Sequence, residues 1–429
     1  MKKFIAFTLT ILYIFSLCFK GAIAGETLTW QDCVKEAEKN HPDLISAGES
    51  IKEYRATGSV TASAILPQLS SSVDVSRSET TSRTAGRKNS TISDSYSYGV
   101  TGTQLLFDGF KTYNDMRQAS ENIKAARHNY NSISSEVRLR LRTAFVNLLK
   151  TQELLNITEE IRKIRKNNLG LISLRYDSGI EHKGAFLTAE ANLAQAELEI
   201  NQTIRTLEVA QRELLKEMGR AQFSPVAVEG AFKVSDAALE KPDFEALAGK
   251  NPSIEKLAAQ TRAAYFGIKT AEADFFPELT ADVGASRTGV HSPPINNQWN
   301  IGLALSFPLF DGGLMLAELA KAKAIFNQAH ADERSAKDGI IATQEQNWAA
   351  LKNAAETVEV QKKFLAAAEE RAKIAEEQYS LGLIQFDNWA IIEDALVTTK
   401  KAFLDAQANA LLAEADWVQA KGETLEYAE

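Results

Sequence analysis

Residues 107–179 decide the fold: they open with Phe107-Asp108-Gly109, close with Tyr176-Asp177-Ser178-Gly179, and contain no proline. The chain repeats this arrangement, opening with Phe310-Asp311-Gly312 and closing with Tyr379-Ser380-Leu381-Gly382. The offset between copies is 203 residues at both ends (311 − 108 and 379 − 176), so the copies match in length. A matched internal repeat predicts two copies of one supersecondary unit.

Inside the first copy, apolar residues recur at three- and four-residue steps, the spacing of one face of a helix. They are Ile123, Ala126, Tyr130, Ile133, Val137, Leu141, Ala144, Leu148, Leu155, Ile161, Ile164, Ile172 and Tyr176. An uninterrupted helix over residues 110–175 would be about 100 Å long, whereas ordinary helices have about 12 residues. The pattern therefore predicts a coiled coil or a similar bundle of long helices.

The first 24 residues have the features of a secretory signal peptide. Lys2 and Lys3 precede an apolar run, and Ala22-Ile23-Ala24 provides the small residues of a cleavage site. Cys18 follows a bulky leucine, Leu17, which fits a lipoprotein signal badly. We expect cleavage between Ala24 and Gly25, and an exported mature protein.

Cleavage would remove Lys2, Lys3 and Lys20 and no acidic residue, so the net charge of −8 would become −11. An acidic chain of this kind is not expected to bind nucleic acid. Cys33 would be the only remaining cysteine, which excludes an intrachain disulfide. After residue 24 no stretch approaches 18 consecutive apolar residues, so no transmembrane helix is predicted.

Two stretches alternate between apolar and small polar residues, the pattern of β-hairpins with one apolar face. The apolar positions are Leu69, Val73, Val75, Tyr96, Tyr98 and Val100 in the first, and Leu279, Ala281, Val283, Ala285, Trp299, Ile301, Leu303, Leu305 and Phe307 in the second. A Ser/Thr/Arg-rich loop is expected between the first two runs. Each run has about ten residues, the length of a tilted membrane-spanning strand. A single such hairpin would favour a hairpin lying on a soluble core. Two at equivalent places, in an exported chain and beside very long helices, favour instead the wall of a water-filled barrel.

These elements divide the mature chain into two repeats joined by a linker. The first repeat, residues 25–218, contains a helix, a hairpin at about 68–107, a long helix at 109–178 and a return helix at 183–218. The linker, residues 219–241, includes a predicted edge strand at 225–228. The second repeat, residues 242–429, contains a helix, a hairpin at about 278–308, a long helix at 312–381 and a return helix at 387–421.

Each strand-to-helix turn is predicted to use an aspartate and a glycine. Asp108 and Asp311 are placed to cap the long helices, and Gly109 and Gly312 let the chain turn from strand to helix.

The chain resembles the TolC-like outer-membrane efflux protein family. The residues that carry the resemblance are Leu66-Pro67-Gln68-Leu69, Leu106-Phe107-Asp108-Gly109, Phe307-Pro308-Leu309-Phe310-Asp311-Gly312-Gly313 and the two Tyr-x-x-Gly turns. The duplicated order of helix, hairpin, long helix, turn and helix is the specific feature. The resemblance implies an α+β membrane protein: a homotrimer in which an α-helical coiled-coil barrel in the periplasm continues into a β-barrel in outer-membrane lipid. It also implies a periplasmic adaptor (membrane-fusion) protein and an inner-membrane pump as partners, for drug efflux or type I secretion.

A shared barrel also follows from the strand count. Four strands cannot close, and an open sheet edge in lipid leaves backbone groups without hydrogen bonds. Two chains would supply eight strands, whose interior is filled by side chains, whereas three would supply twelve and leave room for a channel. The number of chains comes from the resemblance.

The resemblance implies roles for residues at the ends of the long helices. Ser178, Gly179 and Ile180, with Leu381, Gly382 and Leu383, match the glycine-plus-aliphatic turns that meet adaptor tips. Gate candidates are Tyr176, Tyr379, Gln385, Asp387 and Asn388, with Tyr379 at the position of a tyrosine that tethers the coils. The usual aspartate ring falls on Ala185, Asn388 and Ile391, although Asp387, Glu393 and Asp394 stand nearby.

No motif predicts catalysis, a cofactor or a bound metal. The five histidines have no ligand spacing, although His182 beside Glu181 leaves a weak metal hypothesis, and there is no phosphate-binding loop or nucleophile elbow. The run from Arg162 to Lys166 is expected to be a solvated face of the coil. The alternative to an exit duct is an exported coiled-coil structural or adaptor protein without a pore. Such an adaptor should show one hairpin and a separate β-rich domain.

Overall fold

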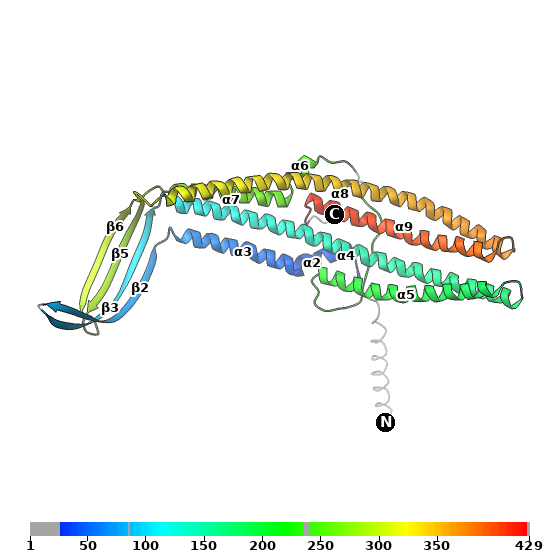
Figure 1. The fold of residues 1–429 in the computed structure, drawn as a ribbon, viewed down its shortest axis with the longest axis horizontal. Helices are drawn as coiled ribbons and strands as arrows, with labels where there is room; N and C mark the ends of the chain where they lie inside the picture. Colours follow the sequence, from blue (N-terminus) through cyan, green and yellow to red (C-terminus); the bar gives the residue numbers. More distant parts are fainter. Residues whose placement is uncertain (1–25, 85, 236–239, 427–429) are drawn as a thin grey trace, which may run out of the picture. The chain divides into compact units, whose positions relative to one another are not determined.

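The computed structural model describes residues 26–84, 86–235 and 240–426 (Figure 1). The predicted signal peptide, including Cys18, lies outside the described residues. In chain order the elements are β1 (Glu26–Leu28), α2 (Trp30–Asn40), α3 (Pro42–Ser63), β2 (Gln68–Thr84), β3 (Arg87–Phe107), α4 (Lys111–Asp177), α5 (Lys183–Glu217), β4 (Val226–Val228), α6 (Phe244–Ala248), α7 (Pro252–Ala273), β5 (Glu278–Gly289), β6 (Asn296–Ser306), α8 (Leu314–Ser380) and α9 (Phe386–Lys421). The paired helices nearly match in length: α4 and α8 have 67 residues each, and α5 and α9 have 35 and 36.

The chain forms two compact units, each built from both halves of the sequence. One consists of the residues up to Ile45, Ser132–Leu247 and the residues from Ile340 onward, and the other of Ser46–Asn131 and Ala248–Gly339. The helices α4 and α8 therefore contribute residues to both units. None of the helices in the described ranges is apolar enough over a sufficient length to cross a membrane.

The second unit contains an antiparallel sheet in the order β2-β3-β5-β6. The pairing of β3 with β5, such as Val100 with Ala285, joins the two hairpins (Figure 1). Directly opposed residues point to the same face, so the register collects the apolar residues of all four strands on one side. This apolar face consists of Leu69, Val73, Val75, Tyr96, Tyr98, Val100, Leu279, Ala281, Val283, Ala285, Trp299, Ile301, Leu303 and Leu305. The opposite face carries mainly Ser, Thr, Asp, Asn and Gly.

The first hairpin is longer than predicted. The strands β2 and β3 have 17 and 21 residues, and the Ser/Thr/Arg-rich segment expected to be a loop is paired as far as Thr84 and Arg87. The predicted length of about ten residues is therefore wrong for this hairpin, although β5 and β6 have 12 and 11. Serine and threonine carry no long apolar alternation to reveal a strand, yet β-branched threonine suits an extended backbone.

Both strand-to-helix turns use the aspartate as a cap, with the helix beginning two residues later than predicted. The Asp108 carboxylate accepts hydrogen bonds from the Thr112 backbone N–H at 2.7 Å and from the Thr112 hydroxyl at 2.5 Å. Gly109 has a φ of 67°, and a Cβ there would lie 2.6 Å from the Phe276 Cβ, so only glycine fits. In the second turn Asp311 accepts from the Gly313 and Met315 N–H groups at 3.0 and 2.6 Å, and Gly312 has a φ of 70°.

The first unit is a body of long helices packed through small residues. One of its buried clusters contains Phe244, Leu351, Trp417 and Ala420, and another contains Val146, Ala408 and Leu411. Within the region predicted as a linker, β4 pairs in parallel with β1, beginning at Glu26 opposite Val226. The sequence did not predict β1 or α6, because three to five residues are too short for a periodic pattern.

Candidate functional site

The turn that joins α4 to α5 is a glycine-terminated helix end. The Gly179 N–H donates to the Tyr176 carbonyl at 2.9 Å, and the Ile180 N–H donates to the Arg175 carbonyl at 2.8 Å. Gly179 has a φ of 71°, the left-handed conformation that this motif requires. The turn from α8 to α9 repeats it, with Gly382 at a φ of 74° and N–H donation from Gly382 to Tyr379 and from Leu383 to Gln378 at 3.0 and 2.8 Å.

Both turns present apolar side chains to solvent. Ile180, Leu381 and Leu383 are 66, 73 and 69 % exposed. A Cβ on Gly179 or Gly382 would meet no atom of the described chain within 4 Å. Ser178 is exposed, and its hydroxyl donates to the Leu174 carbonyl at 2.7 Å. The six predicted docking residues therefore form two open tips, each with at least one exposed aliphatic side chain beside a glycine. Asp177 and Glu181 flank the first tip in the sequence.

Tyr379, just before the second tip, is buried inside the helical body. Only 1 % of the residue is exposed, and its ring stacks on Trp389 with centroids 4.4 Å apart and planes 8° apart. The Arg175 guanidinium carbon lies 4.7 Å from the centre of the same ring. The Tyr379 hydroxyl donates to Glu181 Oε2 at 2.9 Å. Burial, followed by the hydrogen bond to Glu181 and then the charge of Glu181, raises the pKa of Tyr379 to about 12, so the hydroxyl stays protonated and remains a donor.

The environment of Tyr379 joins the two helical hairpins. Its buried cluster contains residues of α4, α5, α8 and α9: Ile172, Ala185, Ala189, Ala375, Phe386 and Trp389. Because Glu181 lies just before α5, the hydroxyl bond ties the first tip to the end of α8. Tyr176, the equivalent residue of the first copy, is 37 % exposed and stacks on Phe186 with centroids 5.6 Å apart. The two gate tyrosines therefore have different environments.

No sequence pattern predicted Arg175 or Trp389 as partners of Tyr379, and Glu181 was considered only as a neighbour of His182. Arg175 and Glu181 lie about 200 positions from Tyr379 in the chain, so no local pattern connects them. A signal for Trp389 was present: Phe386 and Trp389 are three residues apart and both aromatic, the spacing of one helix face.

In the first turn of α9, residues three positions apart share one face, so buried and exposed residues lie on different sides of the helix. Phe386 and Trp389 point into the cluster and are buried, whereas Asp387 and Asn388 between them are exposed. Gln385 occupies the N-cap position, but its side chain makes no capping hydrogen bond. Of the predicted gate residues on this helix, Gln385, Asp387 and Asn388 therefore face solvent in the single chain.

Glu393 and Asp394, the two other carboxylates considered for the gate, differ from Asp387 because one is buried and the other is paired with a cation. Glu393 is buried, and that burial raises its pKa. Asp394 forms an ion pair with Arg165 of α4. The predicted solvated face over residues 162–166 is therefore wrong at Arg165, which is only 8 % exposed, because the α4 surface turns this residue toward α9. Its neighbours Arg162, Lys163 and Lys166 are exposed.

His182 has a structural role at the start of α5. It is the N-cap of α5, and its Nδ1 accepts a hydrogen bond from the Ala185 N–H at 3.0 Å. Within the part of the chain that the structure describes, no group of three His, Cys, Asp or Glu residues is arranged to hold a metal ion.

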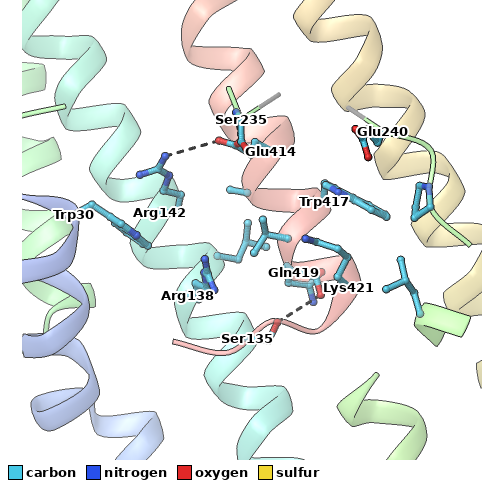
Figure 2. A pocket seen from close by; sticks show the side chains of 15 residues that line it. Trp30, Ser135, Arg138, Arg142, Ser235, Glu240, Glu414, Trp417, Gln419 and Lys421 are labelled. Carbon is cyan, nitrogen blue, oxygen red and sulfur yellow. Dashed lines mark hydrogen bonds and ion pairs between the residues drawn. The ribbon is translucent and has the colours of Figure 1, made fainter. Parts of the chain in front are cut away.

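A cavity of about 360 Å³ lies elsewhere in the helical body (Figure 2). Trp30, Arg138, Arg142, Glu414 and Trp417 are among the residues that line it. Glu414 already accepts from the Ser235 N–H at 2.8 Å and lies 3.9 Å from Arg142. Of the two acidic residues in this wall, Glu240 and Glu414, the second is already engaged by two partners. We place the candidate site at the helical tips, where the predicted docking residues lie exposed.

Comparison with known proteins decides the family. The sequence profile of the family described as "Outer membrane efflux protein" matches residues 33–220 and 245–425, which is most of the chain. The chain belongs to the outer membrane efflux protein family. This family consists of outer-membrane channel proteins, which are not enzymes. The outer-membrane efflux or secretion duct with a periplasmic extension, which the resemblance implied, is thereby confirmed.

The relatives are distant in sequence, and a solved structure of similar identity shares the fold. The outer membrane efflux protein BepC of Brucella suis is 21 % identical over 351 residues, which cover 81 % of this chain and 75 % of BepC. The alkaline protease secretion protein AprF of Pseudomonas aeruginosa is 26 % identical over 316 residues, 69 % of this chain and 64 % of AprF. A crystal structure of CusC superposes with a TM-score of 0.80 at 19 % identity, covering 91 % of each chain. The likeness to CusC shows that this member of the efflux family has the same fold.

Proposed function

We propose that this family member is the passive exit duct of a tripartite efflux or type I secretion system, assembled from three copies. The observation that carries the proposal is the sheet with one apolar face and one polar face. Large apolar side chains on this face are solvent-exposed in the single chain, for example Trp299 at 79 % and Val73 at 78 %. A soluble protein would not leave so large an apolar surface uncovered, whereas lipid would cover it.

The dimensions of the apolar face support a membrane-spanning wall. The face extends from the Leu279–Leu305 pair to the level of Tyr96, which pairs with Gly289, ten residues along the sheet (289 − 279). At the level of Tyr98 it is interrupted on β5 and β6 by Arg287 and Asn297, which hydrogen-bond to each other at 2.7 Å. Ten residues correspond to about 33 Å of strand. At a tilt of about 40° the face is about 25 Å high, the height of the apolar band of an outer-membrane barrel.

Three copies would complete the wall. In the described chain the outer edges of β2 and β6 pair with no further strand, and such edges are not tolerated in lipid. If β2 of one copy pairs with β6 of the next, three sheets close into a twelve-stranded barrel with a polar lumen. The long helices of the two repeats, α4, α5, α8 and α9, would then form a periplasmic coiled-coil tunnel together with those of the other copies.

In this assembly the tips at Gly179 and Gly382 would dock a periplasmic adaptor that connects the duct to an inner-membrane pump. The cluster around Tyr379 would hold the tunnel closed, with Gln385, Asp387 and Asn388 at its entrance. The substrate would be chosen by these partners. Relatives named for efflux and for protease secretion both match the chain, so the class of substrate is left open.

Assembly can be tested on the full-length protein expressed in a Gram-negative host. We expect an oligomer in the outer-membrane fraction that dissociates on heating in detergent, and that conducts ions when reconstituted in planar bilayers. The closed barrel resists detergent because all of its strand edges are paired. Recovery of a monomer from the soluble periplasmic fraction would contradict the proposal.

The role of Asp387 can be tested by single-channel recording of Asp387→Ala. Three symmetric carboxylates around one axis attract cations, so we expect lower cation selectivity and weaker block by divalent cations in the variant. The matched control is Asp394→Ala, which removes an equal charge from the same helix but from a residue paired with Arg165. If selectivity and block are unchanged in the Asp387 variant, this residue does not line the entrance.

A further inference from the structure

The first hairpin continues beyond the rest of the sheet. The pairing of β3 with β5 ends at Tyr96 and Gly289, whereas β2 and β3 remain paired as far as Thr84 and Arg87. Residues 76–95 therefore form a two-stranded ribbon that extends past the ends of β5 and β6 (Figure 1). We call this segment the ribbon.

The two faces of the ribbon differ in chemistry. One face presents hydroxyl groups, from the pairs Ser76–Ser95, Ser78–Ser93 and Thr80–Thr91. The other face presents the pairs Arg77–Asp94, Glu79–Ile92, Thr81–Ser90 and Arg83–Lys88. Because side chains alternate along a strand, this second face continues the apolar face, which ends at the Val75–Tyr96 pair.

Near the sheet this second face carries charges of both signs, Arg77, Asp94 and Glu79, whereas its far end carries the basic pair Arg83 and Lys88. Arg77 donates two hydrogen bonds to Asp94, at 2.6 and 2.8 Å. Arg83 and Lys88 stand directly opposite each other and both are exposed. Neither forms an ion pair with a residue that the structure describes. Like charges in direct opposition destabilise a strand pair unless an anion lies between or beside them. This basic pair occurs in a chain with a net charge of −8, so it does not reflect a generally basic surface.

We propose that Arg83 and Lys88 bind the anionic saccharide headgroups of lipopolysaccharide in the outer leaflet. The proposal rests on the proposed function, since it takes the apolar face to contact lipid. Arg83 lies eight residues beyond Val75 (83 − 75), about 26 Å along the ribbon. At a tilt of about 40° the pair stands about 20 Å above the apolar band, at the level of phosphorylated sugars rather than acyl chains. Arginine and lysine both form charge-assisted hydrogen bonds with phosphate and carboxylate oxygens.

The test compares lipopolysaccharide binding by the purified full-length oligomer and by Arg83→Gln/Lys88→Gln, using native mass spectrometry in detergent. We expect the double variant to bind about tenfold more weakly, the loss of at least one charge-assisted hydrogen bond. The matched control is Lys362→Gln/Lys363→Gln, which removes the same charge from an exposed part of α8 and should leave binding unchanged. Dephosphorylated lipopolysaccharide should bind the unaltered oligomer as weakly as intact lipopolysaccharide binds the double variant.

Three results would overturn the proposal. One is unchanged binding by the ribbon variant, and another is an equal loss in the α8 control. The third is full competition by millimolar inorganic phosphate, which would show a site for free anions rather than for a glycolipid. Heat-modifiability and conductance are measured on the same preparations. If these persist while lipopolysaccharide binding is unaffected, only the ribbon proposal fails; if they are absent from the unaltered protein, the proposed function fails.

Discussion

The double variant Gly179→Asp, Gly382→Asp is expected to lose export completely while its oligomer remains assembled. Both glycines adopt left-handed φ angles, 71° and 74°, which aspartate tolerates better than most residues. A new side chain at either position would extend into open space with respect to the described chain, so packing should not change. In the proposed trimer, six carboxylates would instead lie beside the exposed Ile180, Leu381 and Leu383. An apolar partner surface that covers these tips would bury unpaired charge, which is strongly unfavourable.

The matched control is Gly179→Asn, Gly382→Asn, which has nearly the same size and backbone preference but no charge. Export is measured as drug resistance or as secreted protein, according to the pump that is encoded with the duct. We expect the asparagine variant to retain most of its export, because the glycine turns tolerate this residue. Heat-modifiability of each variant confirms assembly. Normal export by an assembled aspartate variant would contradict docking at the tips.

The second large effect is expected for Tyr379→Phe, which should raise the open probability of the reconstituted channel. Phenylalanine retains the stack on Trp389 and removes only the hydroxyl that donates to Glu181 at 2.9 Å. The loss of one such bond is worth about 1 kcal/mol per protomer. For three protomers that open together the total is about 3 kcal/mol, which corresponds to roughly a hundredfold shift toward the open state.

Variants of Glu181 distinguish this hydrogen bond from a general loosening of the body. Glu181→Gln keeps an oxygen that can accept from Tyr379 and should gate nearly as the unaltered protein does. Glu181→Ala removes the acceptor and should resemble Tyr379→Phe. The combined variant Tyr379→Phe, Glu181→Ala should be no more open than either single variant, since both remove the same bond. Additive effects, or a closed state unchanged in Tyr379→Phe, would show that this bond does not hold the gate.

Much of the fold could be predicted because its helices and strands follow from local periodicity in the sequence. The 3.6-residue period over residues 123–176 predicted a helix that the structure places at Lys111–Asp177. The alternation in residues 278–308 likewise predicted β5 and β6 close to their observed bounds. The glycines at 179 and 382 marked the helix ends, because a left-handed residue is needed there. The polar ribbon at residues 76–95 was missed, since polar and charged residues on both faces produce no hydropathy alternation.

What the sequence determined by itself is the set of elements and their duplicated order, because helix and strand periods depend on residues a few positions apart. The tertiary structure alone decided which distant segments meet. It paired β3 with β5 across about 180 residues and brought Glu181 to the hydroxyl of Tyr379 across 198. It also buried Arg165 and Glu393 while leaving Asp387 in solvent, although all three are charged residues on amphipathic helices. Such contacts depend on how helix faces and strand registers are combined in space, and no local pattern carries that information.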